Sequence, residues 1–160
     1  MSCFSKFGDF DDSLYSHLFK PVSEVDEKIK ELTNDFTEHT FGFHIRRTDH
    51  SISTTESPTQ LFIDKAKECI DLHSDCRLFL ATDDESEKQK FRHLFGTHLI
   101  TSPNEASRSN IEGIRDGVSE MWALSKTQLI YGSSHSTFSM LASKIGGTPL
   151  VVLKRIIVAR

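Results

Sequence analysis

The densest group of chemically versatile side chains is the run FGFHIRRTDH at residues 41–50, where an apolar stretch ends in charged and titratable residues. Arg46 and Arg47 carry planar guanidinium groups whose geometry matches the oxygens of a phosphate or a diphosphate. Adjacent residues at the end of a strand point to opposite faces. One arginine would therefore grip an anion while the other holds the loop or pairs with Asp49. A structural Arg–Asp pair without a ligand is the alternative.

A second polar stretch, ATDD at residues 81–84, begins within the last two residues of the run RLFLAT at residues 77–82. Either Asp83 or Asp84 could cap a helix, because aspartate side chains accept hydrogen bonds from the free backbone N–H groups at a helix N-terminus. Two adjacent acids without a further acidic cluster are too few to indicate a metal site. We therefore predict no bound metal.

The third stretch, GSSHSTFS at residues 132–139, is the strongest local indication of a ligand. Small hydroxyl residues begin a helix there, and the exposed N–H groups and dipole of a helix N-terminus favour an anion. We expect His135, within this loop, to contact the ligand; a Ser/Thr cap without a ligand is the alternative. His44 lies inside a strand and is expected to be a core residue unless its face opens on the ligand crevice.

Predicted strands and helices alternate along the chain. Apolar residues at spacings of three and four predict helices over residues 21–36, 62–73, 84–95, 111–124 and 136–145. Short apolar runs predict strands at FGFHI, RLFLAT, residues 97–100, QLIYG and TPLVVL. Strands that are apolar on both faces indicate an α/β fold, a parallel sheet covered by helices. Residues 21–160 are expected to form one domain, preceded by an irregular lead segment at residues 1–20.

This arrangement brings the polar stretches together, because the ligand crevice of an open parallel sheet lies beyond the carboxyl ends of its strands. Each of the three stretches follows a predicted strand, so we expect them to converge at one edge of the sheet. The sequence contains no G-x-G-x-x-G fingerprint and no Walker loop, which argues against NAD and ATP sites. It also lacks the G-x-S-x-G elbow of a Ser-His-Asp hydrolase.

The composition is that of a soluble globular domain: 160 residues, 37% hydrophobic and 26% charged, with a formal net charge of −4. A slightly acidic chain disfavours nucleic acid as a partner. The apolar runs are far shorter than the roughly 20 residues of a transmembrane helix, and no signal-peptide pattern is present at the N-terminus. Three cysteines without metal-ligand spacing fit reduced thiols, so we predict a cytoplasmic location.

HIRRTD, residues 44–49, resembles the His-x-Arg-Arg-x-Asp signature of the GDP-fucose-dependent fucosyltransferases. That group includes the α1,2- and α1,6-enzymes, nodulation fucosyltransferases and, more distantly, protein O-fucosyltransferases. ATDD and GSSHSTFS resemble its second and third motifs in the same order, so the likeness covers about residues 40–153. The resemblance implies a Rossmann-like domain equivalent to the C-terminal, donor-binding half of a GT-B glycosyltransferase. It also implies metal-independent, inverting transfer of fucose from GDP-fucose to a glycan, with no cofactor besides this donor substrate.

The resemblance also implies roles for individual residues. An arginine of the Arg46–Arg47 pair would hold the diphosphate and neutralise the charge of the leaving group. The other implied donor-binding residues are His44 and Glu120 near the guanine, Asp83 or Asp84 at the nucleotide-sugar, and Ser136, Thr137 and the backbone of Phe138 at the phosphates.

Two acidic residues are candidates for the general base. The α1,6-enzymes carry a catalytic acid a few residues after the first motif, and its nearest counterpart here, Glu56, is displaced along the chain; Asp49 is the other candidate. A base must lie within hydrogen-bond reach of the acceptor hydroxyl.

Chain length limits the predicted activity. A GT-B enzyme has two Rossmann-like lobes with the active site between them, and 160 residues hold one lobe. We therefore expect the donor-binding part of a fucosyltransferase, cut from a longer chain or completed by an N-terminal lobe or a partner subunit. The alternatives are a non-catalytic GDP-sugar or nucleotide-binding module and, less favoured, a hydrolase that uses water as acceptor.

Overall fold

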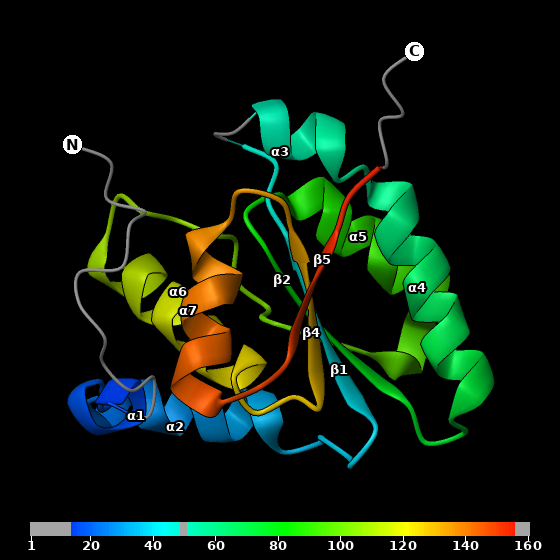
Figure 1. Ribbon diagram of the computed structural model, residues 1–160. Helices are drawn as coiled ribbons and strands as arrows, with labels where there is room; N and C mark the ends of the chain where they lie inside the picture. The colour runs from blue at the N-terminus through cyan, green and yellow to red at the C-terminus, as the bar shows by residue number, and fades with distance from the viewer. Residues whose placement is uncertain (1–13, 49–50, 156–160) are drawn as a thin grey trace.

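The computed structural model describes residues 14–48 and 51–155, in which strands and helices alternate as the sequence predicts (Figure 1). In chain order the elements are α1 (Leu14–Leu18), α2 (Ser23–Thr33), β1 (Thr40–Ile45), α3 (Ser51–Glu56), α4 (Thr59–Leu72), β2 (Arg77–Thr82), α5 (Glu85–Phe95), a 3-10 turn (Gly96–His98), β3 (Leu99–Thr101), α6 (Ile111–Leu124), β4 (Leu129–Ser133), α7 (Thr137–Gly146) and β5 (Leu150–Leu153).

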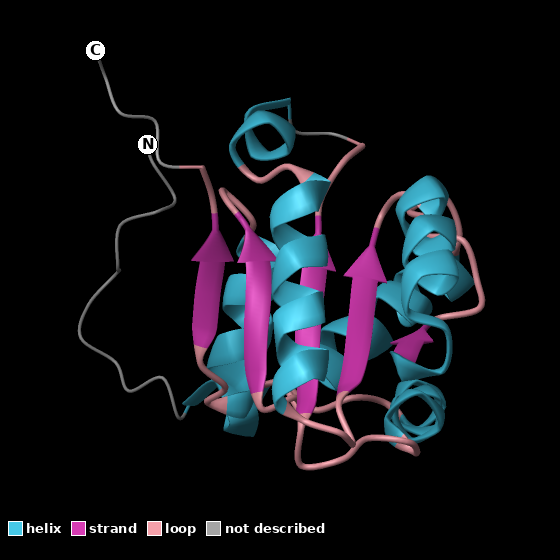
Figure 2. Cartoon of the chain, turned by 90° about the vertical axis from the view of Figure 1, so that its right-hand side faces the viewer, coloured by secondary structure: helices cyan, strands magenta, loops and turns pink. Residues whose placement is uncertain are grey.

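The five strands of the described residues form one parallel sheet in the order β3-β2-β1-β4-β5, which confirms the predicted α/β fold (Figure 2). The chain moves from β1 outward through β2 to β3 and then returns to the other side of β1 with β4. Connections on the two sides of β1 therefore diverge, and the space between the ends of β1 and β4 is a topological switch point. Ligands of open α/β sheets bind at such points.

Helices cover both faces of the sheet, with α4 and α5 on one side and α2, α6 and α7 on the other (Figure 1). Leu78 and Leu80 of β2 belong to the same buried cluster as Phe62 of α4, whereas Phe79 packs with Leu124 of α6. Successive residues of β2 thus face opposite apolar layers. This explains why the strands are apolar without alternation.

Two short helices occur where the sequence carries no helical periodicity. Helix α1 lies in the lead segment that was expected to be irregular. It contacts α7, because the ring centroid of Tyr15 in α1 is 5.0 Å from the Lys144 ammonium of α7. Helix α3 forms in the polar stretch SISTTESPTQ and buries only Ser53 among its residues. Helices this short have too few turns to produce a recognisable apolar stripe.

The apolar residues of α6 mark its core face only in part: Leu124 is buried in the core and Met121 packs against it. Ile111 and Ile114 are exposed, although they continue the spacing that predicts this helix. The residues that α6 buries are Gly113, Ser119, Glu120, Ala123 and Leu124. Small residues therefore allow α6 to pack closely, while part of its apolar stripe is left for another surface.

No helix in the described part of the chain is both long and apolar enough to cross a lipid bilayer.

Candidate functional site

A cavity of about 670 Å³ lies beyond the carboxyl ends of β1 and β2 and extends along α6 and α7. This volume is typical of sites for small molecules and cofactors. Its polar lining includes His44, Arg46, Asp83, Asp116, Glu120, Ser136 and Thr137, and its apolar lining includes Ile114, Val118, Met121, Phe138 and Leu141. The residues following β1, β2 and β4 therefore converge, as the parallel sheet predicts.

Arg46 lies where the exits of β1 and β4 are hydrogen-bonded to each other. Its backbone N–H donates to Ser133 Oγ at 3.1 Å, and that hydroxyl donates to the carbonyl oxygen of His44 at 3.2 Å. Arg46 lines the cavity. The topological switch point thus holds a permanently charged side chain on a backbone that is hydrogen-bonded to the end of β4.

Arg47 lies on the opposite side of the strand end and does not line the cavity. Its Nε donates to Glu87 Oε1 at 3.3 Å, with only 8% of the Arg47 side chain and 7% of the Glu87 side chain exposed. Its Nη2 donates to Thr59 Oγ1 at 3.0 Å. The two arginines thus lie on opposite sides of the strand end, as expected, and the acidic partner of Arg47 is Glu87. Asp49, the predicted partner of an arginine and a candidate for the general base, lies outside the described residues.

The two acids after β2 have different partners. Asp83 lines the cavity and also accepts hydrogen bonds from the Arg47 N–H at 2.8 Å and from Thr48 Oγ1 at 2.7 Å, so it fixes the loop after β1. Asp84 is the N-cap of α5 and accepts from the Ser86 N–H at 2.8 Å. Its hydrogen bond with the Ser86 side chain is the main cause that lowers the pKa of Asp84. The sequence left open which of the two acids caps the helix; the structure shows that it is Asp84, which does not line the cavity.

His44 was expected to be a core residue unless its face of β1 opened on the ligand crevice, and its side chain does line the cavity. Its ring stacks on Phe138, with centroids 4.7 Å apart, and its Nδ1 lies 3.2 Å from Ser136 Oγ. Burial lowers the pKa of His44 to about 4; Asp83 opposes this shift and Arg46 adds to it. The imidazole is therefore neutral at physiological pH.

Glu120 projects from α6 into the cavity wall and is almost fully buried. Burial raises the pKa of Glu120 to about 7, Lys88 counteracts this effect, and Asp116 adds to it. The Lys88 Nζ lies 3.8 Å from Glu120 Oε1. A carboxyl group with this pKa is partly ionised at neutral pH, as is common for groups at functional sites.

His135, in the loop between β4 and α7, does not line the cavity, whereas the residues that follow it do. His135 has a positive φ of 55°, which is uncommon for a residue other than glycine. Its Nε2 lies 3.3 Å from Glu56 Oε2, and neither side chain lines the cavity. The expected ligand contact of His135 and the base role of Glu56 are thus not supported by their positions. Ser136, Thr137 and Phe138 do line the cavity.

Sequence reasoning missed the wall that α6 contributes. Ile114, Val118 and Met121 follow helical spacing and were assigned no site role, yet all three line the cavity. The signal was present in the sequence: α6 also carries a second stripe of small residues, which includes Gly113, Ser119 and Ala123. A helix with one small and one apolar stripe can pack on the first and expose the second to a ligand.

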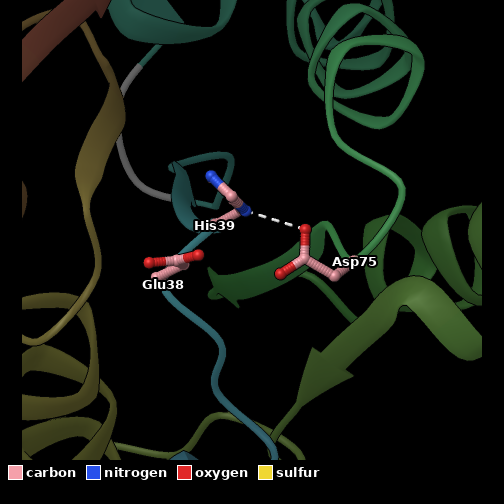
Figure 3. A group of neighbouring side chains, drawn as sticks. All are labelled: Glu38, His39 and Asp75. Atoms are coloured by element: carbon pink, nitrogen blue, oxygen red, sulfur yellow. Dashed lines mark hydrogen bonds and ion pairs between the residues drawn. The ribbon is translucent and has the colours of Figure 1, made fainter.

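A separate group of potential metal ligands lies at the opposite end of the sheet. Among the described residues, Glu38, His39 and Asp75 place one ligand atom each within 4.8 Å of one another (Figure 3). The His39 Nδ1 is 2.7 Å from Asp75 Oδ1, and its ring stacks on His73 with centroids 4.0 Å apart. These residues precede β1 and β2, so this group is separate from the cavity beyond the carboxyl ends of the strands.

Comparison with known proteins gives matches in structure alone. No protein-family model matches the chain, and no curated protein sequence matches it. The structure of POFUT1 in complex with GDP matches with a TM-score of 0.63 at 11% identity, over 89% of this chain and 51% of that chain. NodZ α-1,6-fucosyltransferase soaked with GDP-fucose matches with a TM-score of 0.59 at 22% identity, over 79% of this chain and 43% of that chain.

The fucosyltransferase NodZ from Bradyrhizobium matches equally well, with a TM-score of 0.59 over 79% of this chain and 42% of that chain. At such low sequence identities these matches establish the fold alone. The chain spans about half the length of the POFUT1 chains and less than half of the NodZ chains. Its parallel α/β domain therefore has the fold of one half of these fucosyltransferases.

Proposed function

We propose that this domain binds GDP-fucose and forms the donor-binding part of a metal-independent, inverting fucosyltransferase with a glycan acceptor. The observation that carries the proposal is the meeting of Arg46 with the N-terminus of α7 in one cavity at the switch point of the sheet. A nucleoside diphosphate requires such a combination of a fixed cation and free backbone donors.

Support for a diphosphate site comes from the hydroxyl at the start of α7. Ser136 is the N-cap residue, but its side chain makes no capping hydrogen bond; its Oγ lies beside the His44 ring instead. The N-cap side chain thus leaves the first N–H groups of α7 available to an anion. Arg46, on the neighbouring strand exit, adds a full positive charge to the same region.

The remaining walls suit a nucleoside. The apolar side chains of α6 offer an apolar surface to a planar base, and Glu120 offers carboxylate oxygens to the N–H groups of guanine. The neutral His44 ring, held on Phe138, adds a polar group that does not compete with Arg46 for the phosphates. POFUT1 structures hold GDP or GDP-fucose, and a NodZ structure was soaked with GDP-fucose, which supports the same ligand class.

Chemically, fucose transfer breaks the bond between the anomeric carbon and the diphosphate oxygen while the acceptor hydroxyl forms a bond on the opposite face. Negative charge develops on the departing GDP, and Arg46 together with the α7 N–H groups would stabilise it. A general base, such as an ionised carboxylate, must accept the proton of the acceptor hydroxyl. We propose that this base and the acceptor site are completed by a further lobe or a partner subunit.

A non-catalytic GDP-sugar-binding module is the second candidate. It is favoured by the position of Glu56, which pairs with His135 and does not line the cavity. The two candidates differ in turnover only. Release of GDP that depends on a glycan supports the transferase, whereas binding without turnover supports the module, and release without a glycan supports hydrolysis.

Calorimetric titration of GDP, with UDP as control, tests the proposed donor site. We expect the wild-type chain to bind GDP and Arg46→Ala to weaken binding about 30-fold or more, because a charge-assisted phosphate contact is worth roughly 2–3 kcal/mol. Ser16→Ala, a change on α1 outside the cavity lining, is the control and should leave the affinity unchanged. Equal affinities of wild type and Arg46→Ala would refute the diphosphate site.

A further inference from the structure

Lys88 of α5 is a buried cation to which the proposed donor chemistry assigns no role. Its side chain is only 1% exposed. Its Nζ donates to the carbonyl oxygens of Asn104 at 2.5 Å and Ser102 at 3.5 Å, and lies 3.8 Å from Glu120 Oε1. Burying an ammonium group is costly unless it is paired and hydrogen-bonded. A residue that bears this cost while serving no ligand directly requires another explanation.

All three partners of Lys88 line the cavity, whereas Lys88 itself does not. Ser102 and Asn104 belong to the loop between β3 and α6, and Glu120 belongs to α6. The Lys88 ammonium therefore lies behind the cavity wall and joins two of its segments. Its removal would release both the loop and the carboxylate without removing any group that touches the ligand.

The charge of Lys88 also favours the ionised form of Glu120 against the effect of burial. The charged groups that act on Glu120 are Lys88 from α5 and Asp116 from α6, and they have opposite effects on its pKa. Asp116 is itself hydrogen-bonded to Lys28 of α2 and to Asn104 Nδ2. Without Lys88, burial and Asp116 would both favour the protonated form of Glu120, which is a poorer acceptor.

We propose that Lys88 is a positioning residue for base selectivity, because it holds Glu120 in the cavity wall and favours its ionised form, an acceptor that prefers guanine to adenine. This inference rests on the proposed GDP site. Guanine presents two adjacent donors, N1–H and the 2-amino group, to a carboxylate, whereas adenine presents an acceptor at N1. A site built around a buried acceptor discriminates strongly against a base that cannot donate to it.

The test is the ratio of the GDP and ADP affinities, measured by calorimetry between about pH 6 and about pH 8.5, a range that brackets the pKa of Glu120. Both nucleotides carry the same diphosphate, so their ratio cancels its titration. In the wild type the preference for GDP should rise with pH as Glu120 ionises. In Lys88→Met this rise in the preference should occur about one pH unit higher, which lowers the preference about fivefold near neutral pH.

Two further variants make the test specific. Lys88→Arg keeps the charge and should restore most of the wild-type pH profile. Lys90→Met is the matched control: Lys90 lies on the same helix, but its ammonium pairs with Glu87, 3.6 Å away, and does not contact the cavity wall. This variant should change neither the GDP to ADP ratio nor its pH dependence.

The outcomes separate this inference from the proposed function. If Lys88→Met binds both nucleotides less tightly by the same factor, with an unchanged pH profile, Lys88 is structural only and the inference is wrong while the GDP site stands. If the wild type shows no preference for GDP, both fail. Should Lys88→Met not fold, Lys88→Gln takes its place, because it also removes the charge but can still donate to the loop carbonyls; the same upward shift of the pH profile is expected, and an unchanged profile would overturn the inference.

Discussion

On one side of the end of β1, His44 and Arg46 border a cavity; on the other side, Arg47 is buried against α4 and α5 with Glu87 and Thr59 as partners. The two arginines are neighbours in sequence and have the same chemistry. Their difference arises from the alternation of side chains along a strand, which sends one into each layer of the fold. A doublet of identical residues can therefore place one charge at a cavity and use the other to anchor the loop that presents it.

The anchoring side depends on a buried ion pair, which gives the largest expected effect. Arg47→Met should lower the free energy of unfolding by about 3–5 kcal/mol, because it leaves the buried carboxylate of Glu87 without its guanidinium partner. Urea denaturation measures this change. Arg46→Met, on the cavity side, is the control and should lose less than about 1 kcal/mol. Similar losses in both variants would remove the distinction between the two sides.

On the cavity side, the free energy of unfolding should depend on pH through His44 and Glu120. The folded-state pKa of His44, about 4, lies below the ordinary value of 6.5, so its neutral form contributes stability that is present above about pH 6.5 and lost as pH falls through 4. Glu120 titrates with the opposite sign, because its pKa is raised from 4.5 to about 7 and its stabilising effect is lost as pH rises.

The wild type must therefore be compared with His44→Asn at each pH. The difference in unfolding free energy between the two proteins should shrink by roughly 2 kcal/mol from pH 6.5 to about pH 5, because only the wild type has to protonate a buried imidazole. Chemical denaturation at several pH values measures it. A difference that stays constant over this range would show that His44 is not held neutral.

The two acids after β2 provide a smaller test of the same division. Asp84→Ala should cost about 1 kcal/mol of stability, the usual value of a helix N-cap, and leave GDP affinity unchanged. Asp83→Ala should weaken GDP binding as well, because Asp83 holds the Arg47 N–H and the Thr48 hydroxyl next to the cavity. Thermal unfolding and calorimetry distinguish the two variants. Identical behaviour would indicate that both acids are simple caps.

The smallest effect is expected for the pair of Glu56 and His135, which lies outside the cavity lining. Exposed ion pairs contribute little to stability, so Glu56→Gln should change the unfolding free energy by less than about 1 kcal/mol. It should also leave GDP affinity unchanged. A marked loss of GDP binding in this variant would bring Glu56 back as a residue of the site.

The sequence by itself determined the alternation of strands and helices, the parallel sheet and the convergence of three polar strand exits. These features follow from local signals: apolar periodicity, strand length and the preference of Asp and Ser for helix starts. It also determined that Arg46 and Arg47 must diverge, because side-chain alternation is a property of any strand. Helix α3 was not predicted, because its six residues, five of them polar, form less than two turns and bury little.

Only the tertiary structure decided which partner each polar residue has. Glu87 is buried with Arg47 at a separation of 40 residues, and Lys88 reaches Glu120 across the cavity wall. The same packing turned the apolar stripe of α6 toward the cavity and His135 toward Glu56. Such pairings depend on how helices pack on the sheet and on the register of distant strands, so no local pattern in the chain encodes them.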